Sequence, residues 1–359
     1  MYKAAFTVAV LFAFSVPMAR ADKLVLIAGG GMEESNVPAT RARLVQPFGI
    51  DFDKAGNFYL AELLGQRILK VDAKGLFTIV AGTGKKGDSG DGGPAHLATF
   101  NGMHSLAVTP DGVIYAADTW TNRVRRIDPK AGTIAAFAGT GKKASRGDGG
   151  PAIQADLGGI YCVAFSHDFT KLYLTDLDHR KIHFVDMKTG AIHLVAGNGK
   201  KGMPKDGADA RQSPLVDPRA ACVDRKGNVY ILERGGHALR VVDPAGRIRT
   251  VAGTGKPGNT GDGGDAREAT LNGPKHLCVD LHDNVIIADT ANHVIRKFTP
   301  ADGKVIRIAG TGTKGQSGPG GAPLRVAFNE PHGVFVHPSG TLYIVDSMNH
   351  RVFRWEKER

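Results

Sequence analysis

The sequence predicts an all-β fold: a six-bladed β-propeller with four-stranded blades, in which the N-terminal strand closes the last blade. Three observations support this prediction. A unit of about 57 residues that starts with Ala-Gly recurs along the chain. Glycine is frequent, at 48 residues, whereas aromatic residues are only 7% of the chain, which favours short strands joined by glycine turns. The first expected strand has no partners before it, and the last unit lacks a fourth strand. The six copies of Ala-Gly begin at Ala28, Ala81, Ala138, Ala196, Ala252 and Ala309.

Each unit contains short segments with the character of β-strands. In the second unit they are residues 104–108, 113–117, 124–128 and 133–138, separated by turns such as Pro-Asp-Gly, whose residues favour tight turns. Four antiparallel strands that repeat radially are what a propeller blade requires. The chain has no period-3.6 apolar pattern of the kind that a helical solenoid would need.

The chain ends predict how the ring closes. Residues 23–28 match the fourth strand of a unit but have no first three strands before them, and the last unit ends after its third strand at 351–355. We therefore expect the N-terminal strand to complete the last blade. This pairing removes an exposed strand edge that would otherwise invite aggregation.

Residues 1–21 have the pattern of a signal peptide, and residues 22–359 are expected to form the propeller. Lys3 precedes an apolar run of about 15 residues, short for a membrane span of about 20, and Ala-Arg-Ala at 19–21 resembles a cleavage site. We expect an exported protein, periplasmic or secreted, whose mature chain begins at Asp22, has no membrane span and is a monomer. A retained N-terminal anchor is the alternative.

The charge of the chain favours an anionic partner. The net charge is +11, and it falls to +9 when Lys3 and Arg20 are removed with the leader. For an exported protein, a peptide, an acidic glycan or another protein is a more natural partner than nucleic acid, which we do not expect.

The three cysteines are Cys162, Cys222 and Cys278. Cys222 and Cys278 occupy equivalent repeat positions, and such positions in neighbouring blades are not usually close enough for a disulfide. We interpret all three cysteines as small buried residues.

Three segments carry a resemblance to a known family. The segments DTWTNRVRRID, DTANHVIRKF and DSMNHRVFRW each follow an expected strand and resemble NHL repeats. The resemblance extends over residues 22–359 and implies a six-bladed propeller. It does not define a function, because members of this family include exported or membrane-tethered sensor domains, RNA-binding propellers and a metal-dependent amidating lyase.

The residues that open the first strand of each unit are the best site candidates. In a propeller the first strands line the central channel, so these residues surround its mouth. Two histidines, two cations and two aromatic residues form a more mixed ring than a purely structural position would. The ring consists of Phe48, His104, Tyr161, Arg219, Lys275 and His332.

The resemblance to the peptidyl-hydroxyglycine amidating lyase implies zinc-binding histidines at this type of position. Pro-His-Gly-Val at His332 matches its Pro-His segment well, and His104 matches without the proline. Arg219 stands at the third histidine position and is not a zinc ligand, because it stays protonated. Arg234 follows a second strand, as an arginine of the lyase does. A zinc held by His104 and His332, with water or His276, therefore remains an alternative.

A gluconolactonase-like site is not expected. Enzymes of that kind hold a divalent cation with carboxylate and asparagine oxygens in the channel. The comparable positions here carry Tyr161 and Arg219, which remove oxygen ligands and add positive charge.

A carboxylate ends the second strand of every unit. A residue that recurs six times is typical of a repeated structural role, and we expect these carboxylates to accept backbone N–H groups of the following turn. Cation binding is the alternative interpretation. The six residues are Glu62, Asp118, Asp176, Glu233, Asp289 and Asp346.

The loops between units combine glycines with lysines. The segment GDGG at 90–93, 147–150 and 261–264 lacks the alternating oxygen ligands of a calcium loop, so we expect glycines that permit left-handed turns. The lysines predict a positive face, either simply solvated or anion-binding. They are Lys85, Lys86, Lys142, Lys143, Lys200, Lys201, Lys256 and Lys314.

Together these features predict an exported binding propeller that uses its channel mouth and basic loop face. The alternative is a zinc-dependent, lyase-like enzyme at the channel mouth. No cofactor other than this zinc is indicated, because the sequence has no Walker loop, Ser-His-Asp signature or Cys-x-x-Cys pair.

Overall fold

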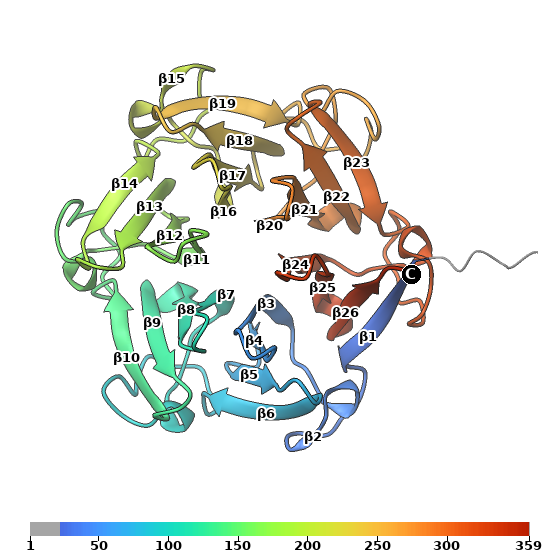
Figure 1. Cartoon of the computed structure of the whole chain (residues 1–359). Helices are drawn as coiled ribbons and strands as arrows, with labels where there is room; N and C mark the ends of the chain where they lie inside the picture. The colour runs from blue at the N-terminus through green and yellow to red at the C-terminus, as the bar shows by residue number, and fades with distance from the viewer. Residues whose placement is uncertain (1–21, 359) are drawn as a thin grey trace, which may run out of the picture.

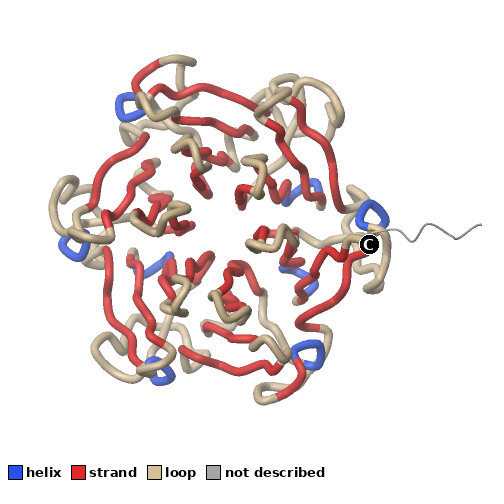
Figure 2. The backbone as a smooth tube through the Cα atoms, viewed as in Figure 1, coloured by secondary structure: helices blue, strands red, loops and turns tan. Residues whose placement is uncertain are grey.

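The computed structural model describes residues 22–358, and the expected signal peptide at 1–21 lies outside this range. Six antiparallel sheets are arranged radially around a central axis (Figure 1). Turns connect the strands within each blade, longer loops connect successive blades, and the few helical segments are single turns (Figure 2). The predicted six-bladed, all-β propeller is confirmed. Within the described range, no helix is long and apolar enough to cross a membrane.

The innermost strands surround the central axis, and the second strands pair with them on the outer side. The innermost strands are β3 (Pro47–Phe52), β7 (Met103–Val108), β11 (Ile160–Phe165), β16 (Pro218–Val223), β20 (His276–Val279) and β24 (Pro331–Val336). The second strands are β4 (Phe58–Glu62), β8 (Ile114–Asp118), β12 (Lys171–Asp176), β17 (Val229–Glu233), β21 (Val285–Asp289) and β25 (Leu342–Asp346).

The third and fourth strands complete each blade toward the outside. The third strands are β5 (Ile68–Val71), β9 (Arg123–Asp128), β13 (Lys181–Asp186), β18 (Ala238–Val242), β22 (Val294–Thr299) and β26 (Arg351–Glu356). The outer strands are β6 (Leu76–Ala81), β10 (Thr133–Ala138), β14 (Ile192–Ala196), β19 (Arg247–Ala252), β23 (Lys304–Ala309) and β1 (Lys23–Gly29). Blades one and four carry an additional edge strand, β2 (Val37–Pro38) and β15 (Ala208–Asp209).

Single-turn 3-10 helices occur at two repeated places. Between blades lie η1 (Ala39–Arg41), η2 (Ala95–Leu97), η4 (Ala152–Gln154), η5 (Ala210–Gln212) and η7 (Pro323–Arg325). After the second strand lie η3 (Thr119–Thr121), η6 (Thr290–Asn292) and η8 (Ser347–Asn349).

The expected ring closure is confirmed. Strand β1 pairs antiparallel with β26, from Lys23 opposite Glu356 to Gly29 opposite Arg351. Leu24 is fully buried in this sheet, in a cluster that includes Phe353. The first and last segments of the chain therefore share one blade, which removes the strand edge that each would otherwise expose.

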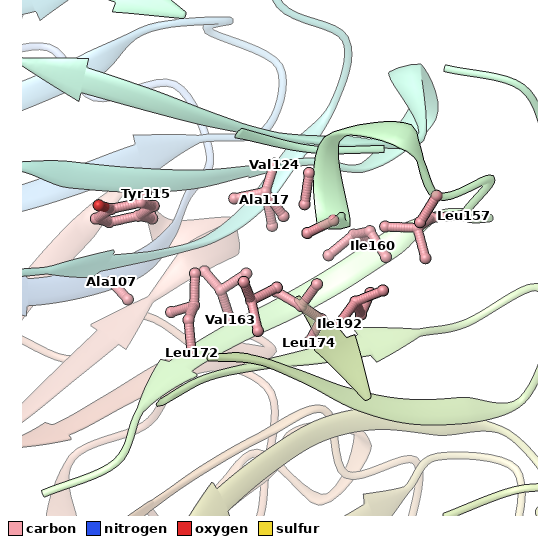
Figure 3. Packing of buried hydrophobic residues seen from close by; sticks show 14 of the residues in the cluster. Ala107, Tyr115, Ala117, Val124, Leu157, Ile160, Val163, Leu172, Leu174 and Ile192 are labelled. Atoms are coloured by element: carbon pink, nitrogen blue, oxygen red, sulfur yellow. The ribbon is translucent and has the colours of Figure 1, made fainter. Parts of the chain in front are cut away.

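The core lies between the blades rather than within one of them. Figure 3 shows the cluster in which Tyr115 and Val124 of blade two face Leu172 and Ile160 of blade three. Equivalent clusters fill the other five junctions. A single blade cannot bury both of its faces, so stability depends on neighbouring blades.

The three cysteines are free, as expected. Cys162 and Cys222 are buried, and burial raises the pKa of the Cys162 thiol to about 11. Cys278 is only partly buried, so the expectation of full burial was wrong for this residue. Its strand β20 is the shortest of the innermost strands, at four residues, and its cluster includes Cys278 only as a peripheral member.

Candidate functional site: the channel mouth

A backbone irregularity sets each mouth residue apart from its sheet. The pairing between the first two strands skips one residue in blades one to four, between Pro47 and Gly49 in the first and between Met103 and Ser105 in the second. The skipped residues are Phe48, His104, Tyr161 and Arg219. In blade six the shift skips His332 together with Gly333, and in blade five Lys275 lies directly before β20. A β-bulge of this kind re-aims a side chain, so the mouth residues leave the regular alternation of the strand.

Four rings form an aromatic floor, which we define as Phe48, His104, Tyr161 and His332. The ring centroids of Phe48 and His332 are 4.0 Å apart, and those of His104 and Tyr161 are 4.2 Å apart. Phe48 also touches His104 edge-on at 5.4 Å. All four rings are at most 7% exposed. Four of the six predicted mouth residues are thus brought into one contact network.

The histidines of the floor are held neutral. Burial lowers the pKa of His104 to about 3, and the charges of Arg219 and Lys275 act in the same direction. Its Nδ1 lies 2.9 Å from the Gly102 carbonyl oxygen. Because a carbonyl can only accept, Nδ1 donates and Nε2 remains an acceptor. Burial also lowers the pKa of His332 well below its ordinary value.

Tyr161 connects the histidines to the cations. Its hydroxyl lies 2.9 Å from His332 Nε2, and the Arg219 guanidinium carbon lies 4.7 Å from its ring centroid. The other imidazole nitrogen of His332, Nδ1, is buried and has no hydrogen-bond partner among residues 22–358. The mouth therefore retains an unused polar atom in its floor.

Three cations lie on blades four and five. Arg219 forms an ion pair with Asp217, and Lys275 forms one with Glu330, both at 3.3 Å. Arg234 is exposed, and its guanidinium makes no ion pair with the described part of the chain. It acts electrostatically on the same region, because its charge lowers the pKa of Lys275, for which burial is the largest cause. Arg219 lowers the pKa of Lys275 in the same way, so the three cations act on one another electrostatically.

The alternative zinc site at His104 and His332 has no ready set of ligands among the described residues. The ring centroids of His104 and His332 are 6.3 Å apart, and those of His276 and His332 are 6.0 Å apart. The described residues contain no group of three His, Cys, Asp or Glu side chains that could hold a metal ion. His332 Nε2 already faces the Tyr161 hydroxyl, and Arg219 adds positive charge beside it. This arrangement favours an anion over a cation.

Sequence reasoning missed Trp120, which adjoins the mouth. Trp120 lies in η3 and is 50% exposed, and its ring touches His104 edge-on with centroids 5.5 Å apart. Lys86 Nζ lies 5.9 Å from the same ring. The signal was present in the segment DTWTNRVRRID, in which Trp120 stands two positions after the repeated carboxylate Asp118.

The six second-strand carboxylates are structural, but their expected partners were partly wrong. They are at most 1% exposed, and each accepts a backbone N–H at 2.5–3.2 Å from the loop before the first strand of its own blade. We expected donors in the following turn, and only Asp176 has one there, from His179. The loop folds back over the blade, and this brings residues 17 or 18 positions upstream to the carboxylate.

Buried arginines of the third strand complete these carboxylate sites. Arg240 lies 2.8 Å from Glu233, and Arg296 lies 3.4 Å from Asp289. Burial raises the pKa of Asp289 to about 7, and the arginine opposes this effect. Blade three is different, because His179 takes the arginine's place beside Asp176 at 2.9 Å. Some basic residues of the third strands are therefore buried ion-pair partners and not solvated surface charges.

The GDGG loops provide further partners for the buried arginines of the third strands. Gly90 and Gly92 have φ values of 105° and 82°, which confirms the left-handed turns. Asp91 of this loop receives Arg125 Nε at 2.9 Å, and Asp262 lies 3.2 Å from Arg296. Asp91 and Asp262 thus pair with arginines, whereas Asp148 of the remaining GDGG loop lies 4.0 Å from His183.

The lysine-bearing loops lie beside the channel mouth, at least in two blades. All eight lysines are exposed. Lys143 forms an ion pair with Asp178 in the turn after β12, and Lys86 faces Trp120 in η3. These turns follow the second strands, so the loops share the face at which the mouth opens.

One family model and several proteins with similar sequences match this chain. The family model described as NHL repeat matches residues 328–355. NHL repeat-containing protein 2 of Bos taurus is 27% identical over 271 residues, which cover 66% of this chain and 37% of that protein. Teneurin-1 of Mus musculus is 29% identical over 221 residues, which cover 57% of this chain and 8% of that protein. The chain thus spans well under half the length of these relatives.

Solved structures with the same architecture cover nearly the whole chain. An auxiliary nutrient binding protein from Bacteroides thetaiotaomicron superposes with a TM-score of 0.67 at 15% identity, covering 94% of this chain and 77% of that chain. A second auxiliary nutrient binding protein, from Bacteroides ovatus, gives a TM-score of 0.67 at 18% identity, covering 95% and 78%. Similarity at this level of identity shows the fold alone.

Proposed function

Because the chain is a six-bladed β-propeller of the NHL-repeat family, we propose that it is an exported binding protein whose channel mouth takes the anionic group of its ligand. The observation that carries the proposal is the aromatic floor bounded on one side by Arg219, Arg234 and Lys275. The ligand belongs to a peptide, an acidic glycan or another protein. The signal-peptide pattern at 1–21 supports export to the periplasm or the medium. The two nutrient-binding neighbours support a binding role for this architecture.

The charges of the mouth explain why an anion is the preferred group. The neighbouring acids Asp217 and Glu330 each pair with one cation, so Arg234 is left to add positive charge. The floor histidines are neutral and contribute hydrogen-bonding atoms without charge. A carboxylate or phosphate beside Arg219 and Lys275 would gain charge-assisted hydrogen bonds in a site with limited access to water.

The proposal is tested with butyrate as a simple carboxylate probe, titrated by ligand-observed NMR. Arg219→Ala should weaken binding at least tenfold, because it removes a partly buried partner of the carboxylate. Arg249→Ala is the matched control, since Arg249 is exposed on the outer strand β19 and should bind like the wild type. Equal binding by wild type and Arg219→Ala, or no binding by either, would overturn an anion site at the mouth.

A further inference from the structure

The face around the mouth is divided into an apolar and a cationic half. The two halves differ in the type of residue that stands two positions after the second-strand carboxylate of each blade. It is large and apolar in blades six, one and two, and it is small or acidic in blades three, four and five. In the order of blades one to six, these residues are Leu64, Trp120, Asp178, Gly235, Ala291 and Met348.

The apolar half is exposed although exposure is unfavourable for such side chains. Leu64 is 53% exposed and Trp120 is 50% exposed, and both belong to turns on the mouth face. Phe48 and His104, the mouth residues of the same two blades, lie in the aromatic floor. Adjacent exposed apolar side chains rimmed by polar residues are typical of a binding surface.

Trp120 is held in a defined position against the backbone. A Cβ atom at Gly102 would lie 2.1 Å from Trp120 Cε3, so only a glycine permits this close contact. The Trp120 backbone N–H also donates to the Asn101 carbonyl oxygen at 3.0 Å. With one side against Gly102 and an edge against His104, the indole is pre-organised and still half open.

The two halves are joined by a continuous row of groups. Trp120 touches His104, His104 stacks on Tyr161, and Tyr161 carries the Arg219 guanidinium on its face. On the cationic side, the equivalent turn residues Gly235 and Ala291 have little side-chain bulk. A ligand that follows this row meets apolar surface at one end and positive charge at the other.

We propose that the ligand is an amphiphilic carboxylate: one carboxylate carried by an aromatic or long apolar group. The carboxylate lies between Arg219 and Lys275, and the apolar group lies toward Trp120 and Leu64. This inference rests on the proposed function and narrows its ligand class. An acidic glycan fits less well, because its hydroxyls and repeated carboxylates would lie against Leu64 and Met348, which offer no hydrogen bonds.

The test compares 4-phenylbutyrate with butyrate, 4-phenylbutyramide and tri-galacturonate by NMR titration and calorimetry. 4-Phenylbutyrate should bind the wild type at least tenfold more tightly than butyrate, because the ring gains aromatic contact. The amide should bind at least tenfold more weakly than 4-phenylbutyrate, because it has no charge. The peptide Gly-Gly-Phe serves as a second source of the same chemistry, and its binding would also support the proposal.

Two variants assign this preference to the apolar half. Trp120→Ala and Leu64→Ser should weaken the binding of 4-phenylbutyrate several-fold and should weaken the binding of butyrate much less. Trp120→Phe should retain part of the preference for 4-phenylbutyrate over butyrate, and this retained binding would show that the site remains folded. Leu97→Ala is the matched control, because Leu97 is 59% exposed but lies in η2 between blades.

The outcomes separate this inference from the proposed function. Tighter binding of tri-galacturonate than of 4-phenylbutyrate, unaffected by Trp120→Ala, would overturn the amphiphilic ligand and leave an anion site in place. Equal affinity for 4-phenylbutyrate and butyrate would have the same meaning. If no carboxylate binds, the proposed function fails and the inference fails with it.

Discussion

The Nδ1 atom of His350 in blade six accepts the backbone N–H of Gln46 in blade one, 304 positions earlier in the chain, at 3.0 Å. The same link recurs between other neighbouring blades. Gly102 donates to the Gln66 side chain, and Gly159 donates to that of Asn122. The accepting residues have positive φ angles, and they are Gln66, Asn122, His237, His293 and His350. In each of these five blades, one side chain from the turn between the second and third strands thus connects the blade to the next one.

These links predict a pH-dependent stability. Burial lowers the pKa of both His293 and His350 below the ordinary value of about 6.5, so the unfolded chain binds more protons than the folded one. Their contribution is complete above about pH 6.5 and is lost as the pH falls. His293→Asn and His350→Asn should keep the hydrogen bond, as Asn122 does in blade two, and reduce the loss of stability on acidification.

The measurement is urea unfolding at a series of pH values. His282→Asn is the control, because His282 is exposed and its side chain makes no interblade bond in the described chain. A pH profile that is identical in the wild type and both Asn variants would contradict the role of these histidines.

Ring closure by β1 predicts a large effect of its removal. Deleting residues 22–28 should expose the edge of β26 and cause loss of solubility or a strongly lowered melting temperature. Leu24→Ala should lower the free energy of unfolding by about 2–5 kcal/mol, the cost of a buried leucine truncation. Lys23→Ala, at the exposed end of the same strand, should have little effect. Unchanged melting of the deletion variant would show that this strand does not hold the ring together.

The buried carboxylates predict moderate and local losses. Asp118→Asn and Asp289→Asn should each lower the free energy of unfolding by about 1 kcal/mol, because Asn can still accept the loop N–H but no longer bears charge toward the arginine. Asp111→Asn, on an exposed turn, should be neutral. Variants that keep full stability but lose a bound calcium ion would reassign these residues to metal binding.

The lysine loops predict weak, salt-dependent binding of polyanions. Charges on this exposed face are screened over about 8 Å at physiological ionic strength, so retention on a heparin-like matrix should fall steeply with salt. Replacing Lys85, Lys86, Lys142 and Lys143 with Glu should abolish retention. Replacing Lys54 and Lys130 with Glu is the control, since they follow the first and third strands on the opposite face. Equal retention by both multiple variants would place the responsible charge elsewhere.

Metal content distinguishes the binding protein from the zinc-dependent alternative. Because the mouth is arranged for an anion, we expect purified protein to contain no stoichiometric zinc. His104→Ala and His332→Ala should not change the zinc content. The measurement is metal analysis of the wild type and both variants. Zinc at one ion per chain that disappears in either variant would support the lyase-like enzyme and oppose the binding protein.

Much of the site could be inferred from the repeat alone. Aligning the units places His104 and Arg219 at equivalent positions, and a propeller brings such positions to one channel. The contacts within the mouth could not be inferred. Nothing local in the sequence indicates that Tyr161 lies between His332 and Arg219, because these side chains come from three different blades. Nor does a basic third strand reveal that Arg125 is fully buried.

The sequence by itself determined the blade, the number of blades and the closure of the ring. These properties follow from local turn chemistry, from strand patterns and from the complementary ends of the chain, all of which repeat in register. Only the tertiary structure decided the character of the mouth. There, strand bulges in five of the six blades set the mouth residues apart from their sheets, and burial and neighbouring charge keep His104 and His332 neutral while three cations gather on one side.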